Sequence, residues 1–224
     1  MPAGYFGKLP LRGDFVEAGA PAGFSSRWDA FVSAGLERAR ADLGAGFDAA
    51  YRTAPLWRFA CAPGVLGEGA VIGVVGPSVD AAGRLFPLAI VAAAAAPDPA
   101  TAMAASGAFF AAAEPAIFTA LDPASDMDVF ERTVAAVPAP SPGHTLSSEG
   151  ASSLVVGAPG ASLGDLLIGA GGVRPVEAYA SVWWSEAGAA DGSAAAYLFE
   201  AAPEAAFWTT IIGGVSAPRP GSAS

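Results

Sequence analysis

The chain has 224 residues, a formal net charge of −10 and only 14% charged residues, against roughly 25% in a typical globular protein. The acidic balance argues against a nucleic-acid partner, which needs clustered lysine and arginine, and against an anionic membrane surface. Apolar residues reach 53%, which supplies a sizeable core, and the length predicts one domain over residues 1–216 with a disordered tail at 217–224.

The first 61 residues predict short strands around one amphipathic helix. Glycine and proline bound the strands, and large apolar residues recur at helical spacing in the helix. Ser26 with Asp29 three residues later predicts the N-terminal cap of this helix, and Gly44 its end. The predicted elements are a strand from Tyr5 to Pro10, an extended piece after the turn at Arg12–Gly13–Asp14, the helix Ser26–Leu43, a helical turn around Tyr51 and the strand Leu56–Cys61.

The stretch Gly69–Ala96 predicts a buried β-hairpin at the centre of the fold. Its apolar runs, Ala70–Val75 and Leu85–Ala94, are nearly continuous, as in strands that are covered on both faces. The segment Gly76–Arg84 between them carries glycine, proline and aspartate, which favour turns. The residues expected in the core are Val71, Ile72, Val74, Leu88 and Ile90. Any function is expected at the loop rather than in the buried strands.

The second half of the chain predicts helices followed by two strands and a closing helix. Ala100–Leu121 has helical composition, and Pro115 is expected to kink or divide this helix. Pro138–Ser153 is rich in proline, serine and glycine and predicts a mobile loop. The remaining predicted elements are a helix at Asp126–Val137, a short strand at Ser153–Val156, a short helix at Ser162–Ile168, strands at Ala178–Trp184 and Ala195–Glu200, and a helix at Pro203–Ile212.

Few residues offer catalytic chemistry. His144 is the only histidine and lies in the predicted mobile loop, so Ser–His or Cys–His catalysis would have to use it. Ser78 follows Gly76 as in a nucleophile elbow, but Asp80 stands where that motif needs glycine. Cys61 is the only cysteine and cannot form an internal disulfide. No cluster has the spacing of a zinc or calcium site, and no glycine-rich phosphate loop occurs, so we expect no metal and no cofactor.

The N-terminus lacks the basic-then-apolar order of a signal peptide. The longest apolar run, Leu85–Ala96, contains Pro87 and is too short to span a bilayer. We therefore expect a cytosolic protein without membrane insertion. The triplet Arg12–Gly13–Asp14 also matches integrin-binding peptides, but a three-residue match in a cytosolic chain is weak support for that function.

Charged side chains gather in the predicted turns of this charge-poor chain. Such residues either form structural ion pairs or present a recognition surface on rigid loops. We expect the N-terminal loop and the hairpin loop to lie together in space. The candidate partner-binding residues on these loops are Lys8, Arg12, Asp14, Ser78, Asp80 and Arg84.

Four blocks of sequence, in chain order, carry a family resemblance. They are G-Y-F-G-K-L-P with R-G-D-F-V and W-D within residues 4–29, A-P-L-W-R-F at 54–59, P-S-V-D with G-R and F-P-L within 77–88, and S-V-W-W at 181–184. Together they resemble the TagF family of type VI secretion proteins, also called ImpM. The blocks span most of the chain, whereas the alanine-rich residues 92–162 match weakly.

The resemblance implies a cytosolic protein that restrains the type VI secretion apparatus after translation by binding the forkhead-associated scaffold protein of that system. Some family members are fused to a protein phosphatase domain, which nothing in this sequence resembles. The family fold implies a three-layer α-β-α sandwich around a mixed, largely antiparallel sheet, and the predicted helices and strands agree with it. We therefore expect a non-enzymatic regulator, or repressor, that acts through protein–protein contacts.

Two alternatives stay open at this point. The first is a hydrolase that uses Ser78 or Cys61, which would need a base beside its nucleophile. The second is a small-molecule sensor with a site at the Ser78–Arg84 loop. A deep pocket lined by Arg12, Asp80 and Arg84 would favour the sensor, and an exposed patch would favour protein binding.

Overall fold

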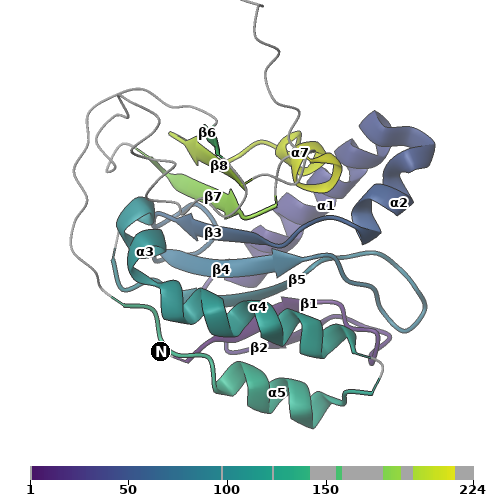
Figure 1. Cartoon of the computed structure of the whole chain (residues 1–224), viewed down its shortest axis with the longest axis horizontal. Helices are drawn as coiled ribbons and strands as arrows, with labels where there is room; N and C mark the ends of the chain where they lie inside the picture. Colours follow the sequence, from purple (N-terminus) through teal and green to yellow (C-terminus); the bar gives the residue numbers. More distant parts are fainter. Residues whose placement is uncertain are drawn as a thin grey trace, which may run out of the picture.

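The computed structural model describes residues 2–96, 98–122, 124–141, 155–157, 179–187 and 194–214 (Figure 1). The strands within these residues are β1 (Gly4–Gly7), β2 (Val16–Ala18), β3 (Trp57–Cys61), β4 (Val71–Gly76), β5 (Leu88–Ala93), β6 (Val155–Gly157), β7 (Ser181–Ser185) and β8 (Ala194–Phe199). They form one eight-stranded sheet in the order β2-β1-β5-β4-β3-β7-β8-β6. Every described pairing is antiparallel, so the largely antiparallel sheet is confirmed and no described pair makes it mixed.

Helices cover both faces of the sheet, which confirms the α/β fold class (Figure 1). The described helices are α1 (Phe24–Leu43), α2 (Phe47–Arg52), α3 (Pro99–Ala105), α4 (Gly107–Leu121), α5 (Met127–Ala135) and α7 (Phe207–Gly213). Helices α3, α4 and α5 lie over one face, and α1 with α7 lies over the other.

Alternate residues of the central strands supply two separate cores, one on each face of the sheet. In β4, Ile72 and Val74 pack with the α3–α5 layer, whereas Val71 and Val75 pack with the α1 layer. All of the hairpin residues that were expected in the core have 0% exposure, which confirms a hairpin covered on both faces. Arg58 of β3 points to the α4 face, as the period of two predicts, where it pairs with a helix carboxylate.

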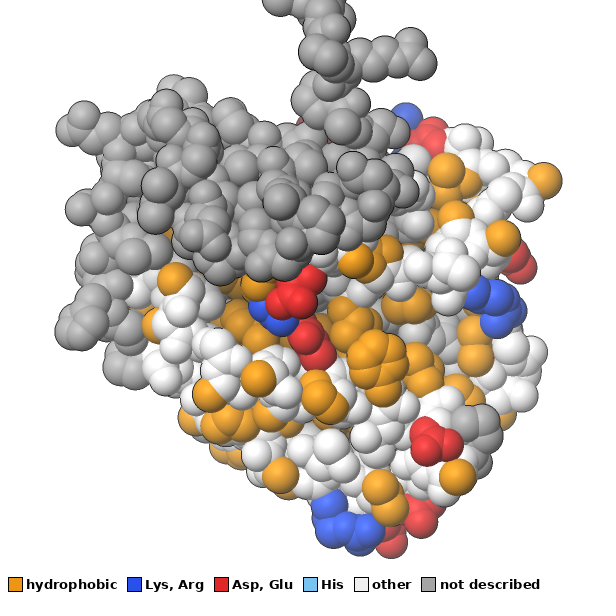
Figure 2. Space-filling model, in the orientation of Figure 1, with side chains coloured by type: hydrophobic (Ala, Val, Ile, Leu, Met, Phe, Trp, Pro, Cys, Tyr) orange, Lys and Arg blue, Asp and Glu red, His pale blue; other side chains and the backbone are white. Residues whose placement is uncertain are grey.

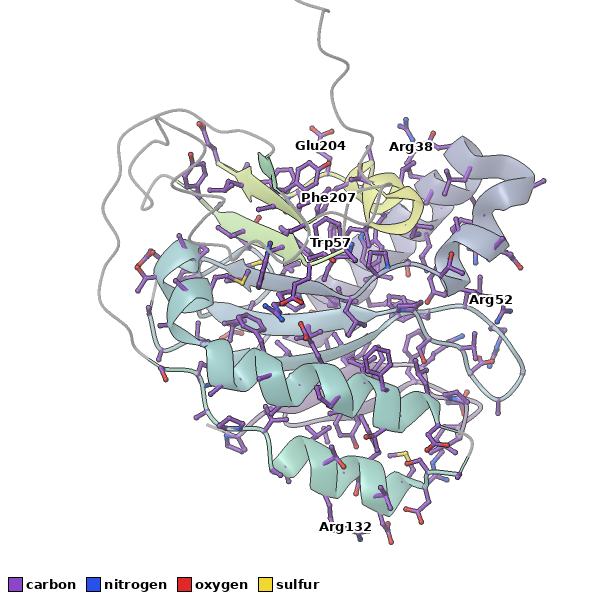
Figure 3. All side chains as sticks on the ribbon, viewed as in Figure 1. Arg38, Arg52, Trp57, Arg132, Glu204 and Phe207 are labelled. Carbon is purple, nitrogen blue, oxygen red and sulfur yellow. The ribbon has the colours of Figure 1, made fainter. Side chains whose placement is uncertain are left out.

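Aromatic rings dominate the core beneath α1 and α7. Trp28 of α1 stacks on Phe59 of β3 with 5.0 Å between ring centroids. Trp57 and Phe207 meet edge to face at 6.0 Å, and Figure 3 shows them between the sheet and α7. Gly35 lets α7 approach α1, because a Cβ there would lie 1.9 Å from the Trp208 ring. The absence of a side chain at this position is therefore a packing requirement.

The long helix α1 begins at Phe24, not at Ser26 as predicted. Gly23 is the N-cap residue, and its φ of 73° lies in the left-handed region that favours glycine. The Ser26 hydroxyl donates to the Gly23 carbonyl at 3.5 Å and caps no N–H group. The predicted cap from Ser26 and Asp29 is therefore wrong, while the predicted end at Gly44 is confirmed.

The alanine-rich helical region divides at Ser106 and not at Pro115. Helix α3 and helix α4 meet there at an angle of 77°. Pro115 lies inside α4, and the residue four positions earlier, Ala111, is also exposed, so water can reach the carbonyl that loses its N–H partner. No single described helix is both long and apolar enough to cross a membrane; only α3 and α4 counted together meet those criteria.

Several predictions in the second half fall outside the described residues or shift at their ends. His144, the predicted helix Ser162–Ile168, the tail 217–224 and most of the predicted loop after Pro138 are not described. Helix α5 and strands β6, β7 and β8 confirm the remaining predicted elements to within a few residues. Helix α7 begins at Phe207 rather than Pro203, because a hydrogen-bonded turn from Glu204 to Phe207 precedes it.

Candidate functional site

The N-terminal loop and the hairpin loop meet at one end of the sheet, as predicted. Strand β1 pairs with β5, so the chain that leaves β1 after Gly7 runs beside the loop between β4 and β5. The N–H of Ala81 donates to the Arg12 carbonyl at 2.9 Å. The Ser78 hydroxyl donates to the Lys8 carbonyl at 2.7 Å. One backbone–backbone bond and one side chain–backbone bond therefore join the two loops.

Asp80 is the centre of this junction. Its side chain has 0% exposure, and its Oδ2 atom accepts hydrogen bonds from Lys8 Nζ at 3.0 Å and Arg84 Nε at 2.6 Å. Its Oδ1 atom accepts from the backbone N–H groups of Ala82 at 3.0 Å and Arg84 at 2.9 Å. The Asp80 carbonyl accepts from the N–H of Gly83, whose φ of 81° closes the turn. The carboxylate is therefore fully occupied by its own loop and by Lys8.

The hydrogen bonds around Asp80 keep it ionised. Burial opposes the negative charge and by itself would raise the pKa. The backbone N–H of Arg84, the ammonium of Lys8, the Arg84 guanidinium and the Ala82 N–H outweigh burial and hold the pKa of that carboxyl well below its usual range. The carboxylate consequently stays charged at neutral pH and binds both loops together.

Ser78 has a structural environment and not that of a nucleophile. Its side chain is buried, and its hydroxyl proton points to the Lys8 carbonyl, which is not a catalytic base. The Tyr51 hydroxyl donates to the Ser78 carbonyl at 2.9 Å and accepts from its N–H at 3.1 Å. Burial of the Tyr51 phenol raises its pKa above the ordinary value, so it remains a neutral donor.

Cys61 is equally unsuited to catalysis in its present position. The side chain is 1% exposed, and burial raises the pKa of the thiol far above its ordinary value. Only the thiolate is a good nucleophile. Within the described part of the chain, no group of histidine, cysteine, aspartate and glutamate is arranged to hold a metal ion.

The charged and aromatic side chains of the joined loops that reach the surface are Arg12, Asp14, Phe15 and Arg84, which we call the loop surface. The Arg84 side chain is 61% exposed and also donates to the Gly13 carbonyl. Phe15 is 46% exposed and packs edge to face against a buried ring of the hairpin, at 4.7 Å. Phe15 was not among the predicted site residues. Its position directly after the polar turn Arg12–Gly13–Asp14 is the sequence feature that could have indicated an exposed aromatic side chain.

The other predicted site residues support the loop surface from beneath. Lys8, Ser78 and Asp80 are buried. The Lys8 ammonium donates a hydrogen bond to the Asp80 carboxylate, and the Ser78 hydroxyl donates one to the Lys8 carbonyl, so both bonds connect the N-terminal loop with the hairpin loop. Because Asp80 has no exposed side-chain surface, it cannot line an open pocket with Arg12 and Arg84. The geometry that the small-molecule alternative required is therefore not formed here.

Comparisons with known proteins identify the family. Residues 4–137, which include both loops of the site, match the TagF N-terminal domain, type VI secretion system-associated. The crystal structure of PA0076 from Pseudomonas aeruginosa PAO1 is similar, with 32% sequence identity and a TM-score of 0.70, over 99% of this chain and 100% of that chain. No curated protein sequence matches the chain. The matching family domain covers more than half of the chain, and the chain therefore belongs to the TagF family of proteins associated with type VI secretion.

Proposed function

We propose that this protein is a post-translational negative regulator of a bacterial type VI secretion system. It acts in the cytoplasm by binding the forkhead-associated scaffold protein of that system, and it uses the loop surface for this contact. Family membership supports the association with type VI secretion. The regulatory role and the partner follow from the resemblance of the sequence blocks to the family.

The observation that carries the proposal is an exposed surface on a rigid base. Arg12, Phe15 and Arg84 are exposed, and the buried bonds of Asp80 and Ser78 hold the two loops that present them. Arginine and aromatic residues are the types that most often dominate the energy of protein interfaces. A surface that is ordered before binding also loses less conformational entropy when the partner arrives.

The same contacts support a role without catalysis. Ser78 and Cys61 are buried, and neither has a base beside it among the described residues. We therefore expect Cys61→Ala and His144→Ala variants to restrain secretion as well as the natural chain does. A folded His144→Ala variant that lost restraint would support the hydrolase alternative, because the chain has no other imidazole.

A secretion assay in a host with an active type VI system tests the regulatory role. Raising the amount of this protein should lower release of a secreted component of the apparatus, and the Phe15→Ala variant should restrain release less. Arg132→Ala is the matched surface control, because Arg132 is exposed on α5 and points away from the molecule in Figure 3. Unchanged release with extra natural chain would contradict the proposed function.

A further inference from the structure

Helix α4 carries a second exposed aromatic residue, Phe118, in a different setting from Phe15. Phe118 is 60% exposed, and the two are the exposed large hydrophobic side chains of the described residues. Phe15 packs against other rings, whereas Phe118 lines an open hollow between α4 and α5 with Pro115 and Val129. Figure 2 shows hydrophobic side chains gathered over α4 on this face.

Acidic side chains border this hollow. Asp122 lines it, and an adjoining hollow that shares Ser125 is lined by Asp126 and Asp128. All three aspartates are exposed, and none forms an ion pair with a described basic side chain. Asp122 accepts the N–H of Ala124 in its own loop, and Asp126, the N-cap residue of α5, accepts the N–H of Val129 in that helix, each at 2.8 Å. These hydrogen bonds hold the two carboxylates in place. Arg12 is the basic residue that lines the pair of hollows.

We propose that this acidic groove binds a basic, amphipathic helical segment of a partner protein. An apolar side chain of the segment occupies the hollow beside Phe118, and its lysine or arginine residues face Asp122, Asp126 and Asp128. This is helix-in-groove recognition, with one apolar anchor and a charged border. The groove adjoins the loop surface at Arg12, and the inference does not rest on the proposed function.

Charge selects this occupant over the alternatives. A second copy of the chain would bring the same aspartates against each other in a symmetric contact, and the whole chain carries a net charge of −10. Nucleic acid and anionic lipid are repelled by the same border. A basic segment gains attraction from the border and apolar contact with the hollow, so it fits both properties of the groove.

The direct test uses the full chain and a synthetic probe. The probe is a labelled amphipathic helix of leucine and lysine, matched in length to the 15 residues of α4, and the comparison peptide replaces each lysine with glutamate. Fluorescence anisotropy should show saturable binding of the lysine peptide alone, weakened by added salt. Phe118→Ala and Asp122→Asn should each reduce its affinity about tenfold. Phe118 and Asp122 are both exposed, so both variants should keep the natural Tm.

Matched variants separate this groove from general charge attraction. Asp48→Asn removes the same charge from α2 and should leave the affinity unchanged, whereas Arg12→Ala should increase it. Equal losses in Asp48→Asn and Asp122→Asn would overturn the inference, and so would no binding of the lysine peptide. Sedimentation that reveals a dimer dissociated by Phe118→Ala would assign the groove to a second copy and also overturn it. Phe15→Ala should not alter peptide binding, so this result is independent of scaffold binding.

Discussion

At the scale of single residues, Asp80 explains why this charge-poor chain keeps charges in its turns. One carboxylate accepts bonds from two backbone N–H groups and two cationic side chains, and it is completely buried. A buried carboxylate is tolerated only when such bonds replace the water that it loses. The pairing of Asp80 with Lys8 and Arg84 is therefore internal structure, and the exposed neighbours are what a partner can touch.

The lowered pKa of Asp80 predicts how stability depends on pH. The folded-state pKa lies below that of an unfolded aspartate, about 3.9, so the carboxylate contributes fully above about pH 4. The contribution of the Asp80 carboxylate to the free energy of unfolding is lost as pH falls below that value toward the folded-state pKa. We expect Asp80→Asn to have a lower Tm than the natural chain at pH 7, with a difference that narrows below about pH 4. Circular dichroism melts across this range measure it, and a constant difference would contradict the assignment.

The two cations that pair with Asp80 should differ in their importance for stability. The Lys8 side chain is 10% exposed and the Arg84 side chain is 61% exposed. Buried pairs are costly to break, whereas exposed pairs contribute little. We expect Lys8→Met to lower Tm by several degrees more than Arg84→Met, as measured by differential scanning calorimetry. A larger loss for Arg84→Met would place the main support of the loop at the surface instead.

Sequence alone identified the charged residues of the site but not the direction in which each side chain points. Their position in turns was sufficient to select Lys8, Arg12, Asp14, Asp80 and Arg84. Lys8 and Asp80 are 72 residues apart in the chain, and lysine is rarely buried without a partner. Only the register of β1 against β5 brings them together, and no local pattern encodes that register.

At the scale of secondary structure, the contact between α1 and α7 depends on one missing side chain. Gly35 is buried in the middle of α1, directly against the Trp208 ring. Trp208 is itself 1% exposed, so it has little room to move. The closeness of these two helices therefore depends on glycine more than on any specific attraction.

Replacing this glycine should destabilise the fold in spite of the better helix propensity of alanine. We expect Gly35→Ala to lower the free energy of unfolding by about 1–3 kcal/mol, the usual cost of overpacking a core. Gly46→Ala is the matched control, because its φ is −80° and a Cβ at that position would meet no other atom within 4 Å; a slight gain is expected there. Urea denaturation measures both changes. Equal stability of the two variants would show that Trp208 can shift freely.

The helix and strand types were predictable where the pattern was long, and the ends were not. The unbroken apolar runs of β4 and β5 required cover on both faces, which the structure provides. The start of α1 escaped prediction because Gly23 caps the helix through its backbone conformation. The break at Ser106 escaped because proline is the stronger helix breaker in isolation, whereas exposure of Pro115 makes it tolerable within α4.

At the scale of the whole molecule, the loop surface and the groove beside Phe118 differ in charge and in the residues that hold them in place. The loop surface carries Arg12 and Arg84 around Phe15 and is held by the buried bonds of Asp80. The groove beside Phe118 carries aspartates on the ends of α4 and α5. The proposed regulatory role needs stable surfaces rather than a catalytic cleft, and both faces have this property.

Isothermal titration of the two purified proteins measures whether the loop surface binds the forkhead-associated scaffold protein. We predict saturable binding that Arg12→Ala and Phe15→Ala each weaken about tenfold, as expected for interface hot spots, with Tm values close to that of the natural chain. Arg132→Ala should bind as the natural chain does. Absence of binding, or the same affinity in all three variants, would contradict the claim.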